Sequence, residues 1–113
     1  MQRFNLKDNL VRKIYKTKSG KIWLATGKYG LGEWKNELSP RIDYYLNDPL
    51  AISSLSNNNV YDLVADAQDN LWVSTYGGGL NYFNTKTGRA THIDVTNNYW
   101  KDLKWIAAVA FGW

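Results

Sequence analysis

The sequence contains no cysteine, only one histidine and only two prolines among its 113 residues. Without cysteine there can be no disulfide bonds or thiolate metal ligands, and a single histidine makes a zinc site implausible. No run of about 18 apolar residues occurs, so no part of this chain is predicted to insert into a membrane. Residues 1–8 also lack the apolar stretch of a signal peptide, so we expect no export signal here. No metal and no cofactor are expected.

Aromatic residues are abundant: they make up 15% of the chain, within a hydrophobic total of 44%. This composition is typical of a folded core rather than of disorder, and the length allows one domain at most. Residues 57–93 alternate short apolar runs with turns of Asn, Asp and Gly. Such runs predict short antiparallel strands joined by tight connections. The predicted strands are Val60–Val64, Leu71–Thr75, Leu80–Phe83 and Ala90–Ile93.

The same pattern occurs upstream at an offset of 49 positions. The offset aligns Asn9, Val11, Trp23, Thr26, Gly30 and Leu31 with Asn58, Val60, Trp72, Thr75, Gly79 and Leu80. The upstream strands are predicted at Val11–Lys16, Ile22–Thr26, Leu31–Trp34 and Arg41–Leu46, and a one-residue gap aligns Tyr44 and Tyr45 with His92 and Ile93. A fixed period of this length indicates a repeat architecture. Four strands in about 35 residues is the size of one propeller blade.

The downstream copy resembles a known repeat. Its run Asp69–Thr75, followed by Gly77–Asn81 and then Thr87-Gly88, looks like the two-component regulator propeller repeat, and Ser19–Leu31 matches more loosely. The resemblance covers residues 5–95. It implies an all-β fold of two four-stranded antiparallel propeller-type blades, as in the extracytoplasmic sensor region of hybrid histidine kinases. It further implies a periplasmic or extracytoplasmic location, so we expect either a leader outside this sequence or a fragment of a longer sensor.

We therefore predict a single partial propeller domain over residues 1–113. Blade one is residues 9–46, a linker follows at 47–57, blade two is 58–95, and a tail occupies 96–113. Tyr99–Trp113 fits a helical face and a strand alternation equally well, so its structure stays open. Closed propellers have about four to eight blades, and each blade buries its apolar faces against neighbours. The expected partners are the remaining propeller blades or further copies of this chain.

The recurring residues are interpreted as structural. Trp23 and Trp72 occupy one position per repeat, as packing between blades requires, and Gly30 and Gly79 are expected to supply turn geometry. Residues 66–70, with two aspartates and an asparagine, are read as a hairpin turn rather than a calcium loop. His92 is expected to be a half-buried strand residue. No pair of carboxylates recurs at strand ends, so no catalytic residue is assigned.

Loop residues that differ between the two blades are better candidates for binding, because loops carry function on a rigid scaffold. On this basis Lys28, Tyr29, Arg41 and Tyr76 are the predicted ligand-binding residues. Residues 1–35 hold nine basic and two acidic residues, which predicts a basic face on blade one. A solvated surface is the favoured interpretation, and an anionic glycan stays open. Nucleic acid is disfavoured, because the aromatic residues are not interleaved with the basic ones.

The leading functional hypothesis is a ligand-sensing propeller fragment with a glycan-derived ligand, which binds without catalysis and is not an enzyme. Ligand contact would shift how propellers pack, and that shift would be transmitted. Two alternatives are retained. One is an orphan structural fragment, and the other is a fragment of a propeller-type carbohydrate-active enzyme.

Overall fold

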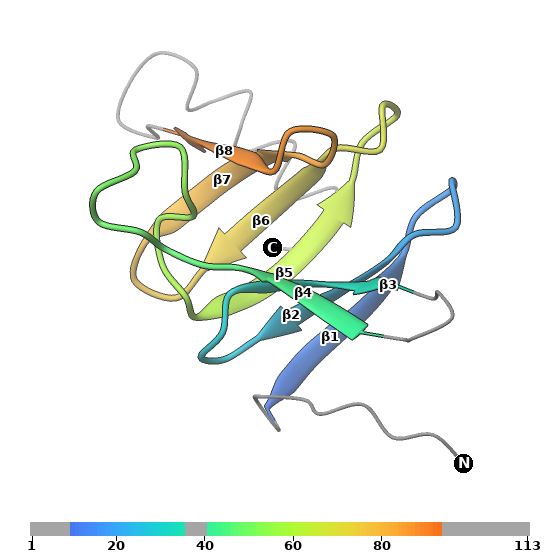
Figure 1. Ribbon diagram of the computed structural model, residues 1–113, viewed down its shortest axis with the longest axis horizontal. Helices are drawn as coiled ribbons and strands as arrows, with labels where there is room; N and C mark the ends of the chain where they lie inside the picture. The colour runs from blue at the N-terminus through green and yellow to red at the C-terminus, as the bar shows by residue number, and fades with distance from the viewer. Residues whose placement is uncertain (1–9, 36–40, 94–113) are drawn as a thin grey trace.

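The computed structural model of the chain describes residues 10–35 and 41–93. These residues form eight strands in two four-stranded antiparallel sheets, each with its strands in sequence order (Figure 1). Blade one contains β1 (Val11–Lys16), β2 (Ile22–Thr26), β3 (Leu31–Lys35) and β4 (Arg41–Tyr45), and blade two contains β5 (Val60–Ala65), β6 (Leu71–Thr75), β7 (Gly79–Asn84) and β8 (Arg89–Ile93). The all-β prediction is confirmed, and each predicted strand is found with ends that agree to within one residue. The described residues include no helix that could cross a membrane. The predicted tail, residues 96–113, lies outside them.

Strand register shows that the two blades are copies of one unit. Each blade has a β-bulge at the start of its first strand, between Val11 and Lys13 in blade one and between Val60 and Asp62 in blade two. The one-residue gap is confirmed as well: Leu31 lies opposite Tyr45, and Leu80 lies opposite Ile93. Because the bulge and the pairings recur, a residue in blade one has a structural equivalent in blade two.

The turns have the chemistry that the sequence predicts. Asp66 Oδ1 accepts hydrogen bonds from the backbone N–H groups of Gln68, at 2.9 Å, and Asn70, at 3.0 Å. Gly30 and Gly79 have φ angles of +68° and +82°, which residues with a Cβ rarely adopt. At Gly30 an added Cβ would also lie 2.1 Å from the carbonyl oxygen of Tyr45, so glycine is required there for space as well.

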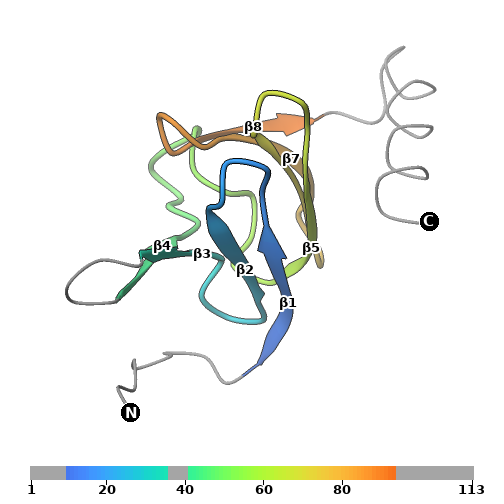
Figure 2. The same ribbon diagram turned by 90° about the vertical axis from the view of Figure 1, so that its right-hand side faces the viewer.

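The main core lies between the two blades, which face each other (Figure 2). Trp23 is fully buried there, with its ring centroid 5.7 Å from that of Phe83 on β7 in an edge-on arrangement. The buried members are Trp23, Ala25 and Leu31 from blade one, Leu55 from the linker, and Val60, Leu63, Leu71, Val73, Phe83 and Ala90 from blade two. The prediction that Trp23 packs between blades is confirmed. Trp72, its equivalent, is half-buried against Tyr82, with the ring centroids 4.7 Å apart.

Polar contacts also join the blades. At the inner strands, Lys13 Nζ lies 2.8 Å from Asp62 Oδ1. At the turns, the backbone N–H of Ser19 donates to Asp69 Oδ2 at 3.3 Å. Hydrogen bonding from the Ser19 side chain to the Asp69 carboxylate holds the pKa of Asp69 below its usual range. The two sheets are therefore held in register by contacts at their inner edge and at one end.

The linker is ordered by asparagine and serine side chains. Asn47 donates two hydrogen bonds: its backbone N–H donates to Asn58 Oδ1 at 2.6 Å, and its Nδ2 donates to the Leu55 carbonyl at 2.7 Å. Asn81, which is fully buried, donates from Nδ2 to Ser56 Oγ at 2.8 Å. These bonds satisfy polar groups that would otherwise be buried without partners. The linker thereby fixes where blade two begins.

Candidate functional site

Two loops, one from each blade, meet at one end of the molecule. They are residues 27–30 between β2 and β3 and residues 76–78 between β6 and β7. The N–H of Gly30 donates to the carbonyl of Asn58, and the N–H of Tyr76 donates to that of Asn59, both at 2.8 Å. Because consecutive carbonyls anchor them, the loops lie side by side. We refer to the surface formed by these two loops and residues 58–61 as the loop end.

Three of the four predicted ligand-binding residues lie at the loop end. Lys28 is exposed, Tyr29 is half-buried, and Tyr76 is 69% exposed. Arg41 does not join them. It is the first residue of β4 and lies opposite Lys35, whereas the last residue of β4, Tyr45, is the one that lies near the loop end. Four residues of extended strand separate these positions by about 13 Å. Arg41 instead contacts Asp43 on its own strand, with Nε 3.0 Å from Oδ1.

Two tyrosine pairs stand at the loop end. Tyr61 and Tyr76 have ring centroids 6.4 Å apart and are 51% and 69% exposed. Tyr29 packs on Tyr44 at 6.0 Å. Exposed aromatic rings held in place by a neighbouring ring offer flat apolar faces beside a polar hydroxyl. Such faces can stack against the apolar face of a sugar ring.

A cationic pocket of about 290 Å³ lies beside Tyr61, lined by Arg12, Lys13, Tyr61 and Asp62. The guanidinium of Arg12 is positioned by bonds from Nη1 to the Val60 carbonyl, at 3.0 Å, and to Asn59 Oδ1. Lys13 is held by its ion pair with Asp62. The pocket thus combines two placed cations, one anion and an aromatic ring, which suits a polar ligand with a negative group.

Sequence reasoning missed Arg12, Lys13, Tyr61 and Asp62 as site residues. A signal was available, since Arg12 is equivalent to Tyr61 and Lys13 to Asp62 at the 49-residue offset. The blades differ in residue type at both positions, which is the criterion that singled out the loop residues. It was applied only to loops, and these residues lie on strands.

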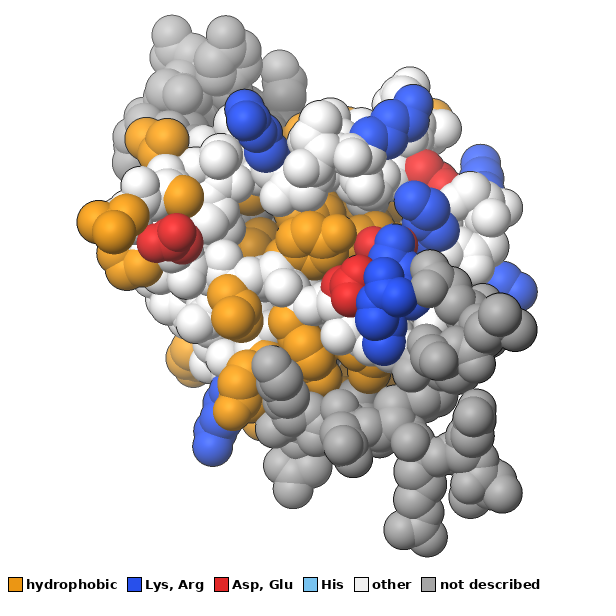
Figure 3. Space-filling view, in the orientation of Figure 1, with side chains coloured by type: hydrophobic (Ala, Val, Ile, Leu, Met, Phe, Trp, Pro, Cys, Tyr) orange, Lys and Arg blue, Asp and Glu red, His pale blue; other side chains and the backbone are white. Residues whose placement is uncertain are grey.

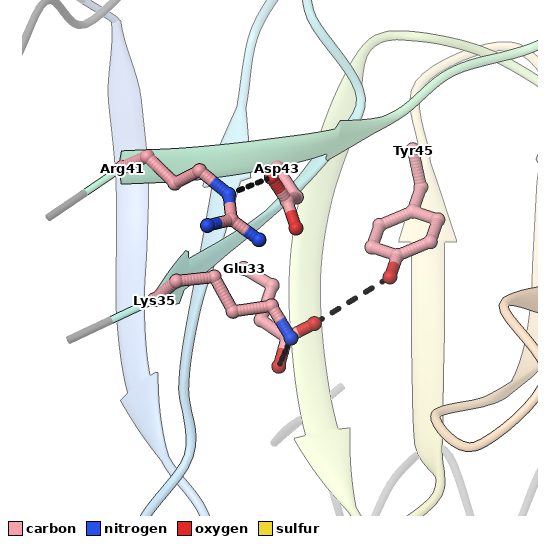
Figure 4. Close-up of polar contacts among 5 residues, drawn as sticks. All are labelled: Glu33, Lys35, Arg41, Asp43 and Tyr45. Carbon is pink, nitrogen blue, oxygen red and sulfur yellow. Dashed lines mark hydrogen bonds and ion pairs between the residues drawn. The ribbon is translucent and has the colours of Figure 1, made fainter. Parts of the chain in front are cut away.

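A polar cluster occupies the outer rim of the interface between blades (Figure 4). Glu33 is only 3% exposed, and its carboxylate lies 3.1 Å from Lys35 Nζ while accepting a hydrogen bond from the Tyr45 hydroxyl at 3.5 Å. The bond to Glu33 raises the pKa of Lys35. Burial, followed by the negative charge of Glu33, raises the pKa of Tyr45.

Among the strands that the structure describes, one pair of carboxylates lies directly across two strands and so bears on an enzymatic function: Glu33 lies opposite Asp43 in the β3–β4 register. Each carboxylate is engaged by a cation, Glu33 by Lys35 and Asp43 by Arg41. In the space-filling view, acidic and basic side chains lie against one another at this edge of blade one (Figure 3). The geometry favours a structural role over paired acid–base chemistry.

Replacing Tyr45 with Phe is expected to flatten the alkaline limb of the stability profile. Because the folded pKa of Tyr45 is raised, its contribution is complete below the unfolded value of about 10 and is lost as the pH rises through the folded value. The free energy of unfolding should therefore fall between pH 9 and pH 11 in wild type, roughly, and fall less in Tyr45→Phe. Denaturant unfolding at each pH measures this.

The matched comparison is Tyr82→Phe, because burial followed by the hydrogen bond to Asp66 raises the pKa of Tyr82 as well. Each substitution should remove part of the alkaline slope. An unchanged slope in Tyr45→Phe would contradict the buried setting of this hydroxyl.

His92 differs from the expectation. It lies on β8 as predicted, but its side chain is exposed, not half-buried, and Nε2 lies 2.7 Å from the Ser54 carbonyl. The reason is that β8 is the last strand of its sheet, and the linker meets it through two backbone carbonyls, of Ser53 at the Ala90 N–H and of Ser54 at His92 Nε2, which leaves the His92 ring exposed. Across residues 10–35 and 41–93, no three His, Asp or Glu side chains cluster in a way that could hold a metal.

The fold and the repeated register define the class of this protein: it consists of two four-stranded blades of the β-propeller kind. Two segments, residues 5–28 and 54–77, match the family model of the two-component regulator propeller. The two matched segments lie 49 residues apart, one in each predicted repeat.

Two solved structures are similar to the chain. One is the extracellular domain of the hybrid two-component system BT3049 from B. thetaiotaomicron, with a TM-score of 0.73 and 28% identity over 82% of this chain. The other is the extracellular domain of the one-component system BT4673 from the same organism, with a TM-score of 0.59 and 22% identity over 78% of this chain. The chain spans 13% and 12% of the lengths of these two structures. No curated protein matches it.

Proposed function

We propose that this chain is the ligand-sensing part of an extracytoplasmic propeller, and that it binds a glycan-derived ligand without catalysing a reaction. The similarity to extracellular domains of bacterial regulatory systems supports a sensor fragment. The extracytoplasmic location rests on the same relatives. The ligand class and the site are inferred from the loop end.

The observation that carries the ligand class is the Tyr61–Tyr76 pair beside the cationic pocket. A sugar ring presents an apolar face that can stack on an exposed aromatic ring, and its carboxylate or sulfate can accept hydrogen bonds from Arg12 and Lys13. The excess of basic residues in blade one favours an acidic oligosaccharide over a neutral one.

A route from binding to signal follows from the anchoring of the loop end. The site takes Arg12 and Lys13 from blade one and Tyr61 and Tyr76 from blade two. A ligand that contacts both blades therefore has a different affinity for different blade packings, which is what a population shift requires. Sensing then needs no chemical step.

The proposal is tested by screening the full chain on an array of acidic and neutral glycans and measuring the affinity of hits by calorimetry. Tyr76→Ala is expected to weaken binding about tenfold, since one stacked ring contributes roughly 1.4 kcal/mol. Lys86→Ala is the control, because Lys86 is exposed in the turn between β7 and β8 at the opposite end. The absence of any glycan binding, or equal losses in both variants, would overturn the proposal.

A further inference from the structure

Each blade has two faces, and the structure shows how unlike faces fit together. We define the tryptophan face as the side that carries Trp23 in blade one and Trp72 in blade two. The aliphatic face is the opposite side, with Ile14 and Ile22 in blade one and their equivalents Leu63 and Leu71 in blade two. In the chain, the tryptophan face of blade one packs on the aliphatic face of blade two. The described residues leave the other two faces without a neighbouring blade.

Burial at equivalent positions reflects this difference. Leu63 is fully buried in the interface, whereas Ile14 is 68% exposed. Leu71 is fully buried, whereas Ile22 is half-buried. An exposed isoleucine at a position that the repeat otherwise buries is a contact surface without its partner.

The charges of the inner strands would also suit such a contact. Lys13 and Asp62 occupy the same repeat position, and they form the ion pair between the blades. If a second copy stacked with the same geometry, its Lys13 would lie beside Asp62 of the first copy. The inner strands would then alternate Lys and Asp from blade to blade, so each new interface would repeat an opposite-charge contact.

A hollow borders the open aliphatic face. A pocket of about 370 Å³ is lined by residues that include Lys21, Ile22 and Trp34. Ile22 and Trp34 are equivalent to Leu71 and Phe83, which belong to the cluster that holds Trp23 in the internal interface. Trp72 is equivalent to Trp23, so the matching occupant of this hollow is Trp72 of another copy.

We propose that the chain associates head to tail with copies of itself, with the tryptophan face of blade two packing on the aliphatic face of blade one in the next copy. The contact repeats the internal interface. A head-to-tail contact whose rotation closes gives a ring, and rings of about four to eight blades would need two, three or four copies of this two-blade chain. The proposal does not depend on the ligand.

The first test is the mass of the full chain by light scattering and native mass spectrometry. Wild type should have a mass two to four times that of one chain, roughly as ring closure requires. Ile14→Asp should be a folded single copy, because it places a charge on an exposed position of the open face. Ile52→Asp is the control: Ile52 is 91% exposed in the linker, outside both faces, and its substitution should leave the assembly unchanged. A monomeric wild type would overturn the proposal.

The second test establishes that unlike faces pair. Ile14→Asp blocks the aliphatic face of blade one, and Trp72→Glu blocks the tryptophan face of blade two. Each variant alone should be a single copy, but an equimolar mixture should form a dimer with one copy of each, because one intact face of each kind remains. Val64→Glu, on the same face as Trp72, replaces Trp72→Glu if the latter fails to fold. Head-to-tail pairing would be overturned if Ile14→Asp alone formed dimers. It would also be overturned if Ile14→Asp formed no dimer with the folded partner variant, Trp72→Glu or Val64→Glu.

Discussion

Replacing Trp23 with Ala is expected to lower the free energy of unfolding by about 4 kcal/mol, because the largest buried side chain of the core would leave a cavity. Trp72→Ala, at the same repeat position, should cost half as much or less, roughly 1–2 kcal/mol, since Trp72 is only half-buried and packs on Tyr82. Urea unfolding followed by circular dichroism measures both. Both are best measured in an Ile14→Asp background, which removes any contribution from association.

Trp23→Phe is the control for the loss of the ring. It keeps an aromatic contact with Phe83 and Tyr45 and should cost less than Trp23→Ala. Equal losses for Trp23→Ala and Trp72→Ala would mean that both tryptophans are packed alike. That result would contradict the structural difference between the covered and the open tryptophan face.

The strands could be predicted because their signals are local and occur twice. Each strand is a short apolar run between turn residues, and the 49-residue offset aligns the two copies. The turns follow from side chains with one structural role, such as Asp66, which accepts two backbone hydrogen bonds. Even the one-residue gap before Tyr45 was readable, because the residues on either side of it keep the repeat pattern.

The site was less predictable, for reasons that the strands make clear. Arg41 was grouped with loop residues, although it begins β4 at the end opposite the loop end, and the strand runs from there toward the loop end at Tyr45. Arg12 and Tyr61 lie on strands, where alternation predicts which face a side chain occupies. The bulge at the start of β1 and β5 inserts a residue there, so simple alternation does not hold at these two positions.

Which face of a blade is buried depends on which segments lie together in space. The repeat pattern alone does not show which of the two faces is covered. Ile14 and Leu63 have nearly the same side chain and the same repeat position, yet one is exposed and the other fully buried. Only the position of a blade within the stack decides between these outcomes.

Leu63→Asp is expected to unfold the chain or separate the blades, with a loss of more than about 4 kcal/mol, because an unpaired carboxylate would be buried in an apolar interface. Its position makes the cost higher still, since Asp62 is adjacent and already pairs with Lys13. The equivalent substitution Ile14→Asp should leave the free energy of unfolding within roughly 0.5 kcal/mol of wild type, as exposed positions usually do. Circular dichroism melts, compared below the concentration at which copies associate, test this contrast. If Leu63→Asp melted like wild type, Leu63 would not lie between the blades; if Ile14→Asp were equally damaging at every concentration, its side chain would be packed within a single chain, and the face would not be open.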